Sequence, residues 1–206
     1  MHFVKWARSP GYVRTVVQGL VLVTSPAVAG TPFGWTISAS STDAEVSWAP
    51  PLRIPGTVDL YLWFACSPFF NGLVAAEFAV TGTLGVLQFT PLNGFQNIGT
   101  AANLLLLNWS CPAPPALAGV LTVHDPGGGG TLCFGLSQAA ELTSVDCVAN
   151  SEYPMDYVGF ASDGSPPCYQ IQWDDFPCGL SPGNPPTSTS EGVESFTFGR
   201  VKAVYR

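Results

Sequence analysis

The chain has 206 residues, of which 47% are hydrophobic and 10% are charged, and it contains 22 glycines and 19 prolines. Seven Lys and Arg residues stand against fourteen Asp and Glu residues, a formal charge of −7 at pH 7. This balance argues against nucleic acid or an anionic membrane as a partner, because both are bound through clustered basic side chains. It fits an exported, β-rich protein better than a helical cytosolic enzyme.

The first 29 residues have the layout of a secretory signal peptide. Basic residues at positions 5, 8 and 14 precede an uncharged stretch that is apolar in its middle and ends in Ala27, Val28 and Ala29. The apolar part is shorter than the roughly 20 residues of a transmembrane helix, so we expect cleavage and no membrane span afterwards. A buried core segment or a retained anchor is the alternative. Without this segment the formal charge becomes −10.

The middle of the chain alternates apolar and polar residues with the period of two that is typical of a half-buried strand. In residues 57–66 every even-numbered side chain is apolar, and residues 73–81 repeat the pattern with Val74, Ala76, Phe78 and Val80 on one side. Shorter runs predict further strands at residues 33–37, 46–48, 86–90, 102–111, 117–123 and 131–136.

The short runs also predict which side chains face the core. We expect Leu87 and Phe89 to point inward, and likewise the odd-numbered residues of 117–123 and the even-numbered residues of 131–136. Four glycines at positions 127–130 separate the last two runs, which indicates a hairpin.

Eight to ten short strands without an amphipathic helix between them predict an all-β fold, an antiparallel β-sandwich over residues 30–163. Each strand with one apolar face needs a second sheet to bury it. We therefore expect a hydrophobic core between two sheets, with the loops and one outer face left for recognition.

In order, these segments resemble the cohesin-type β-sandwich, an Ig-like or jelly-roll layout, and more narrowly a set of uncharacterised exported bacterial proteins. The likeness rests on residues 57–64, 72–78, 86–91, 103–109, 117–123 and 133–137, with a cysteine near each of positions 111, 133 and 147. Cohesins dock a partner module through one sheet face. The resemblance thus implies an extracellular scaffold or adhesion part.

All six cysteines lie after residue 29, and disulfides persist in an exported protein. No Cys-x-x-Cys spacing occurs and a single histidine follows residue 29, so we expect structural bridges and no metal site. We favour the pairing Cys168–Cys178, which closes a short loop, then Cys133–Cys147 and, by exclusion, Cys66–Cys111.

His124 and Asp125 invite comparison with a catalytic triad in which Ser137 or Ser144 is the nucleophile. No Gly-x-Ser-x-Gly elbow occurs, and a lone histidine before a Pro-Gly turn is typical of a surface turn, so we expect no catalysis. The glycines at 127–130 lack the Lys-Ser/Thr of a phosphate loop. We expect a flexible turn there and no cofactor.

The carboxylates of Asp163, Asp174 and Asp175 are calcium candidates by residue type. The Asp-x-Asp-x-Asp-Gly spacing of a calcium loop is missing, so the sequence favours solvated loop carboxylates.

Two features point to recognition at the surface. Tyr61 and Trp63 lie on the polar side of residues 57–66, where two planar rings form a platform for a sugar or a protein. Coverage of both rings by a second sheet or the tail is the alternative. Asn108, Trp109 and Ser110 form a glycosylation triplet, but inside a predicted strand.

The composition shifts to Pro, Gly, Ser and Asp after residue 163. Residues 164–195 read as a linker pinned by its own cysteine pair. Residues 196–206 resemble short endings of other exported bacterial proteins and suggest a sorting or anchoring signal; a last strand or helical turn is the alternative. The signal would rest on Phe198, Gly199, Arg200, Lys202, Tyr205 and Arg206.

The sequence therefore predicts a secreted or cell-surface module that binds or scaffolds without catalysis. Its expected partner is an unknown protein or a surface glycan. A carbohydrate-binding module that uses Tyr61 and Trp63 is the first alternative, and a secreted hydrolase is the second.

Overall fold

The computed structural model describes residues 33–67 and 71–170, so the predicted signal peptide at residues 1–29 and the predicted C-terminal segment at 196–206 lie outside the described residues. Within it the chain is all-β and contains no helix, so none could cross a membrane. The strands are β1 (Phe33–Ser38), β2 (Gly56–Cys66), β3 (Leu73–Gly82), β4 (Gly85–Pro91), β5 (Gln96–Asn97), β6 (Asn103–Leu107), β7 (Ala116–Asp125), β8 (Thr131–Gly135), β9 (Thr143–Asp146), β10 (Glu152–Val158), β11 (Phe160–Ala161) and β12 (Tyr169–Gln170).

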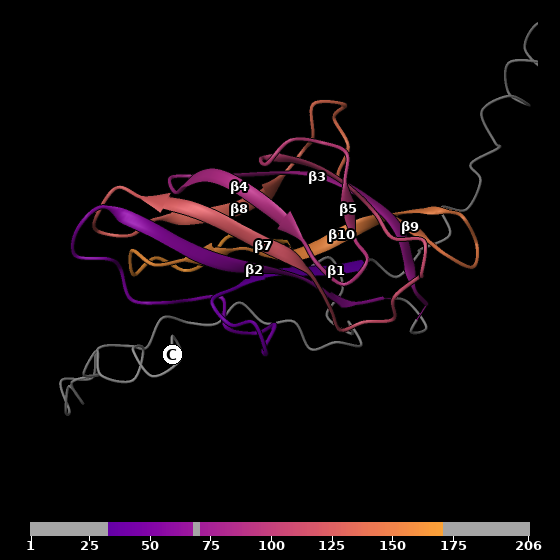
Figure 1. The fold of residues 1–206 in the computed structure, drawn as a ribbon, viewed down its shortest axis with the longest axis horizontal. Coiled ribbons are helices and arrows are strands. Elements are labelled where there is room, and N and C mark those ends of the chain that lie inside the picture. Colours follow the sequence, from indigo (N-terminus) through magenta and orange to yellow (C-terminus); the bar gives the residue numbers. More distant parts are fainter. Residues whose placement is uncertain (1–32, 68–70, 171–206) are drawn as a thin grey trace, which may run out of the picture.

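The strands form two layers. Sheet 1 holds β4, β7, β2 and β1 side by side (Figure 1). It continues through the second half of β10 to β12. Sheet 2 has β3 at its centre, paired with β6, β8 and β9, while β5 pairs with β6 and β11 with β8. β10 joins the sheets, because its first residues pair with β9 and its last with β1. The predicted β-sandwich is confirmed.

One strand pairing departs from the predicted antiparallel arrangement. β1 runs parallel to β10, with Phe33 opposite Met155 and Thr36 opposite Val158. A parallel pair needs a long crossover connection, and here the whole of β2 to β9 lies between the two strands. The sheet is therefore mixed.

An aromatic cluster fills the space between the sheets. The ring of Trp35 on β1 lies 5.6 Å from Phe64 on β2 and 5.2 Å from Phe78 on β3. Phe78 in turn lies 5.1 Å from Phe134 on β8. The indole nitrogen of Trp35 donates to the hydroxyl of Ser144 at 3.0 Å, so the one polar atom of this large side chain is satisfied inside the core.

The alternation of β2 is confirmed. Its even-numbered residues point inward, and Leu60, Leu62 and Phe64 have no exposed surface. On β3 the prediction holds for Ala76, Phe78 and Val80, which are all buried.

Bulges overturn three of the inward predictions. On β3 the register shifts between Leu73 and Ala75, which buries Leu73 and leaves Val74 half-exposed. On β4 a shift next to Leu87 leaves that side chain 57% exposed. On β7 a shift buries Ala118 and leaves Leu117 half-buried opposite Trp63, whereas Leu121 and Val123 are buried as predicted.

The glycine run connects the two sheets, so the predicted hairpin is wrong. β7 pairs within sheet 1 and β8 within sheet 2. Gly127, Gly128 and Gly129 have φ angles of 99°, 94° and 80°, which glycine adopts without strain. The buried carboxylate of Asp125 accepts the N–H groups of Gly127 and Gly129, at 2.8 Å and 3.2 Å, and holds this crossover. Beyond β8, Leu136 is 63% exposed and not inward as predicted.

Several short strands escaped prediction. The expected strand at residues 46–48 is reduced to one bridge between Trp48 and Ala161, while β5, β9, β10, β11 and β12 were not expected. β12 and Cys168 belong to the sandwich, although they fall within the predicted linker. The fold thus extends past residue 163.

Candidate functional site

Tyr61 and Trp63 lie on the outer face of sheet 1, where the alternation of β2 places them. Both side chains are half-buried. Tyr61 is opposite Val120 on β7, and Trp63 is opposite Leu117. Two residues before Tyr61, the exposed carboxylate of Asp59 accepts the hydroxyl of Thr122 at 2.7 Å. From Thr57 to Trp63, every second residue of β2 therefore contributes a polar or aromatic side chain to one surface.

The connection between β1 and β2 reaches over this face beside Trp63. Residues 39–46 are fastened there by three side-chain donors, Thr36, Ser38 and the indole nitrogen of Trp63. They bind the carbonyl oxygens of Ala44, Asp43 and Ser40, at 2.8 Å, 2.5 Å and 3.1 Å. A loop held at three points is preorganised, and it covers part of Trp63.

A hollow of about 290 Å³ opens between this connection and the sheet. The residues that line it carry an indole ring, a proline ring, one hydroxyl and two exposed carboxylates. The residues are Thr42, Asp43, Ala44, Glu45, Trp63, Ala65 and Pro115. Of these the sequence indicated Trp63 alone, because the others come from loops and from the outer end of β2.

The described cysteines are all in disulfides, as predicted, but each of the three predicted pairings is wrong. Cys111 is bonded to Cys147 and Cys133 to Cys168, while Cys66 is also disulfide-bonded. Cys178 lies outside the described residues. Sheet geometry decides the pairing, because both bridges join segments about 35 residues apart in sequence whose Cα atoms lie 5.9 Å and 5.7 Å apart.

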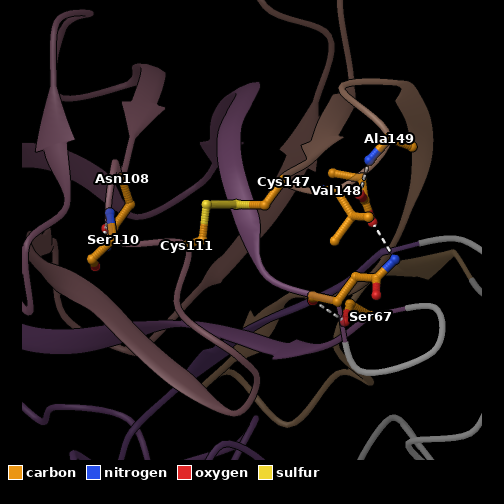
Figure 2. The surroundings of a disulfide bond; sticks show 9 residues. Ser67, Asn108, Ser110, Cys111, Cys147, Val148 and Ala149 are labelled. Carbon is orange, nitrogen blue, oxygen red and sulfur yellow. Dashed lines mark hydrogen bonds between the residues drawn. A yellow bond between two sulfur atoms is a disulfide. The ribbon is translucent and has the colours of Figure 1, made fainter.

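The Cys111–Cys147 bridge fastens the loops at one end of the sandwich (Figure 2). The buried carboxylate of Asp146 accepts the N–H groups of Val148 and Ala149, at 2.6 Å and 2.7 Å, and the side-chain amide of Asn71 at 2.7 Å. Gly72 is required nearby, since a Cβ there would lie 2.3 Å from the carbonyl oxygen of Cys111. The bridge is thus set in a closely packed frame.

Two exposed apolar side chains stand next to this bridge. Trp109 is 72% exposed and Val148 is 76% exposed, and each lies within two residues of a bridged cysteine. Sequence reasoning missed both as surface features, because it placed Trp109 in a strand and gave Val148 no role. The only available signal was their proximity to cysteines.

Asn108 is buried, so the glycosylation triplet is closed in the folded protein. Its side chain is 1% exposed, and its amide nitrogen donates to the carbonyl of Asn93 at 3.1 Å. Its amide oxygen accepts the hydroxyl of Ser110 at 2.6 Å. A glycan on this nitrogen would displace the bond to Asn93.

The structure does not bring the triad candidates together. His124 is exposed at the end of β7, and the carboxylate of Asp125 is engaged by backbone N–H groups. Ser137 donates to Glu77 at 2.7 Å, and Ser144 is buried against Trp35. Asp125, Ser137 and Ser144 each have a structural partner, and His124 is exposed.

The predicted calcium candidates are Asp163, Asp174 and Asp175. No group of three or more His, Cys, Asp or Glu side chains in the described range is arranged to hold a metal ion. Asp163 instead accepts the N–H and the hydroxyl of Ser165, and these hydrogen bonds lower the pKa of its carboxyl. Asp174 and Asp175 lie outside the described residues.

Comparisons with known proteins add no relatives: no family model, no curated protein and no solved structure matches this chain.

Proposed function

We propose that this protein is an exported, non-catalytic binding module that holds another macromolecule outside the cell or at its surface. The observation that carries this proposal is the half-buried pair Tyr61 and Trp63 on the outer face of sheet 1. β2 is hydrogen-bonded to β1 on one side and β7 on the other, so both rings stand on a fixed backbone. Rigid aromatic rings supply much of the binding energy at protein interfaces.

Export is supported by the oxidised cysteines, because disulfides persist outside the reducing cytosol. It also accords with the expected signal peptide at residues 1–29. Residues 196–206 would then serve in sorting or anchoring. A cohesin-like role, in which a sheet face docks a partner protein, is the form of binding that this surface favours.

Carbohydrate binding is the second candidate function, and it is supported by the side chains of β2. Asp59, Tyr61 and Trp63 follow one another at every second residue, with the Thr122 hydroxyl beside them. Flat rings next to polar groups form a platform on which a sugar ring stacks.

The test measures attachment of the purified protein to the surface fraction of the producing cells. Trp63→Ala should weaken attachment at least about tenfold, roughly 1.4 kcal/mol, as expected for a central aromatic contact. Trp63→Phe should restore part of the loss, which separates lost contact from misfolding. Trp109→Ala is the matched control, because Trp109 is exposed at the disulfide-fastened end.

The proposal is wrong if Trp63→Ala attaches as well as the wild type, or if Trp109→Ala loses as much attachment as Trp63→Ala. A glycan array run with the same proteins then decides between the two ligand classes.

A further inference from the structure

The hollow beside Trp63 presents hydrogen-bond acceptors and the face of an indole ring to a ligand, but few hydrogen-bond donors. The indole N–H already donates a hydrogen bond to the carbonyl of Ser40 at 3.1 Å, and the hydroxyls of Thr42 and Ser40 are hydrogen-bonded to each other at 3.2 Å. Asp43 and Glu45 contribute carboxylates, both exposed. A ligand that fits these walls must bring its own donors.

The charge of the sandwich points the same way. Residues 33–67 and 71–170 contain ten Asp and Glu residues and a single basic residue of the Lys/Arg type, Arg53. An acidic body draws cations toward it, and a carboxylate-lined recess concentrates that attraction. An indole ring adds a further attraction for a cation over its face.

The size of the hollow suits one side chain. Its volume of about 290 Å³ lies at the lower end of the range for ligand sites, roughly 300–1,000 Å³. The walls are also fixed, because residues 39–46 are fastened to β1 and β2 at three points. A preformed recess loses little entropy when it is filled.

We propose that this hollow receives the lysine or arginine side chain of a basic partner protein, with its cation between the carboxylates of Asp43 and Glu45 and its alkyl stem against Trp63. The inference rests on the proposed function and names the partner's chemistry. A glycan is the competing occupant, and the experiment separates the two.

The experiment titrates the full chain with three probes in calorimetry at low and high salt. The probes are a blocked peptide of alternating glycine and lysine, its glutamate counterpart, and a neutral oligosaccharide. The double variant Asp43→Asn, Glu45→Gln removes two charges but keeps an oxygen for the N–H of Glu45, which Asp43 accepts at 2.9 Å. The control variant combines Glu141→Gln with Glu152→Gln. It removes two exposed charges, one from the loop before β9 and one from the first residue of β10.

We expect the lysine peptide to bind the wild-type protein, and to bind it more weakly at high salt. The Asp43→Asn, Glu45→Gln variant (the hollow variant) should lose about tenfold in affinity for this peptide. The affinity of the control variant should stay within about twofold of the wild type. Equal losses of affinity in both variants would show that binding depends on the net charge of the protein and not on the hollow, and would overturn the inference. Binding of the oligosaccharide alone, or of no probe, would also overturn it.

The proposed function has a separate outcome. If Trp63→Ala detaches the protein from the surface fraction while the hollow variant attaches normally, the inference about the hollow is wrong, but the outer face of sheet 1 remains the proposed binding face. If Trp63→Ala has no effect on attachment, the binding face itself fails.

Discussion

Phe78 connects the two layers of the sandwich at the level of single residues. It has no exposed surface, and its ring packs between Trp35 from sheet 1 and Phe134 from sheet 2. Both neighbours are themselves large and rigid, so a void left by Phe78 has little means to close.

We therefore expect Phe78→Ala to lower the free energy of unfolding by about 3–5 kcal/mol, from lost burial and the remaining cavity. Urea denaturation measures the change. Leu87→Ala is the control, because Leu87 is 57% exposed on a bulge of β4 and should change stability by less than about 0.5 kcal/mol. Similar losses in both variants would place Phe78 outside the core.

The candidate site shows how far single residues can be placed from sequence. Tyr61 and Trp63 were predicted on the outer face because their neighbours on β2 are apolar at every even position. Asp43, Glu45 and Pro115 were not predicted, because loop residues carry no period. Asp43 and Glu45 are positioned by hydrogen bonds from β1 to the connection, which become visible only in three dimensions.

At the scale of elements, long alternating strands were predictable and irregular ones were not. β2 and β3 have 11 and 10 residues, enough for the period of two to stand out. β10 buries both Met155 and Asp156 in succession, so it lacks that period, and β5, β11 and β12 have two residues each. The bulges at Val74 and Leu87 likewise leave no signal in the order of apolar residues.

The Cys111–Cys147 bridge is the element-scale contact with the clearest consequence. It closes a 36-residue separation, so the chain-entropy relation gives about 3–4 kcal/mol of stabilisation through the unfolded state. We expect the double variant Cys111→Ala, Cys147→Ala to lose about this much and to show a larger urea m-value, because its unfolded chain is more expanded.

Non-reducing peptide mapping of the wild-type chain provides the control for this prediction. It should recover a 111–147 link and a 133–168 link. A loss of less than about 1 kcal/mol with an unchanged m-value would show that the bridge does not restrict the unfolded state.

At the scale of the whole molecule, the sandwich offers two different surfaces. The outer face of sheet 1 carries Tyr61 and Trp63 next to a carboxylate-lined hollow. The disulfide-fastened end carries Trp109 and Val148, which are apolar and exposed. Its charge and shape are the reason that we propose the first surface as the place of recognition.

Oxidative footprinting of the protein, free and attached to the surface fraction, tests this claim most directly. Modification of Tyr61 and Trp63 should fall on attachment, while modification of Trp109 stays as it is in the free protein. Protection of Trp109 with unchanged labelling of Trp63 would contradict the account and move the recognition surface to the other end of the sandwich.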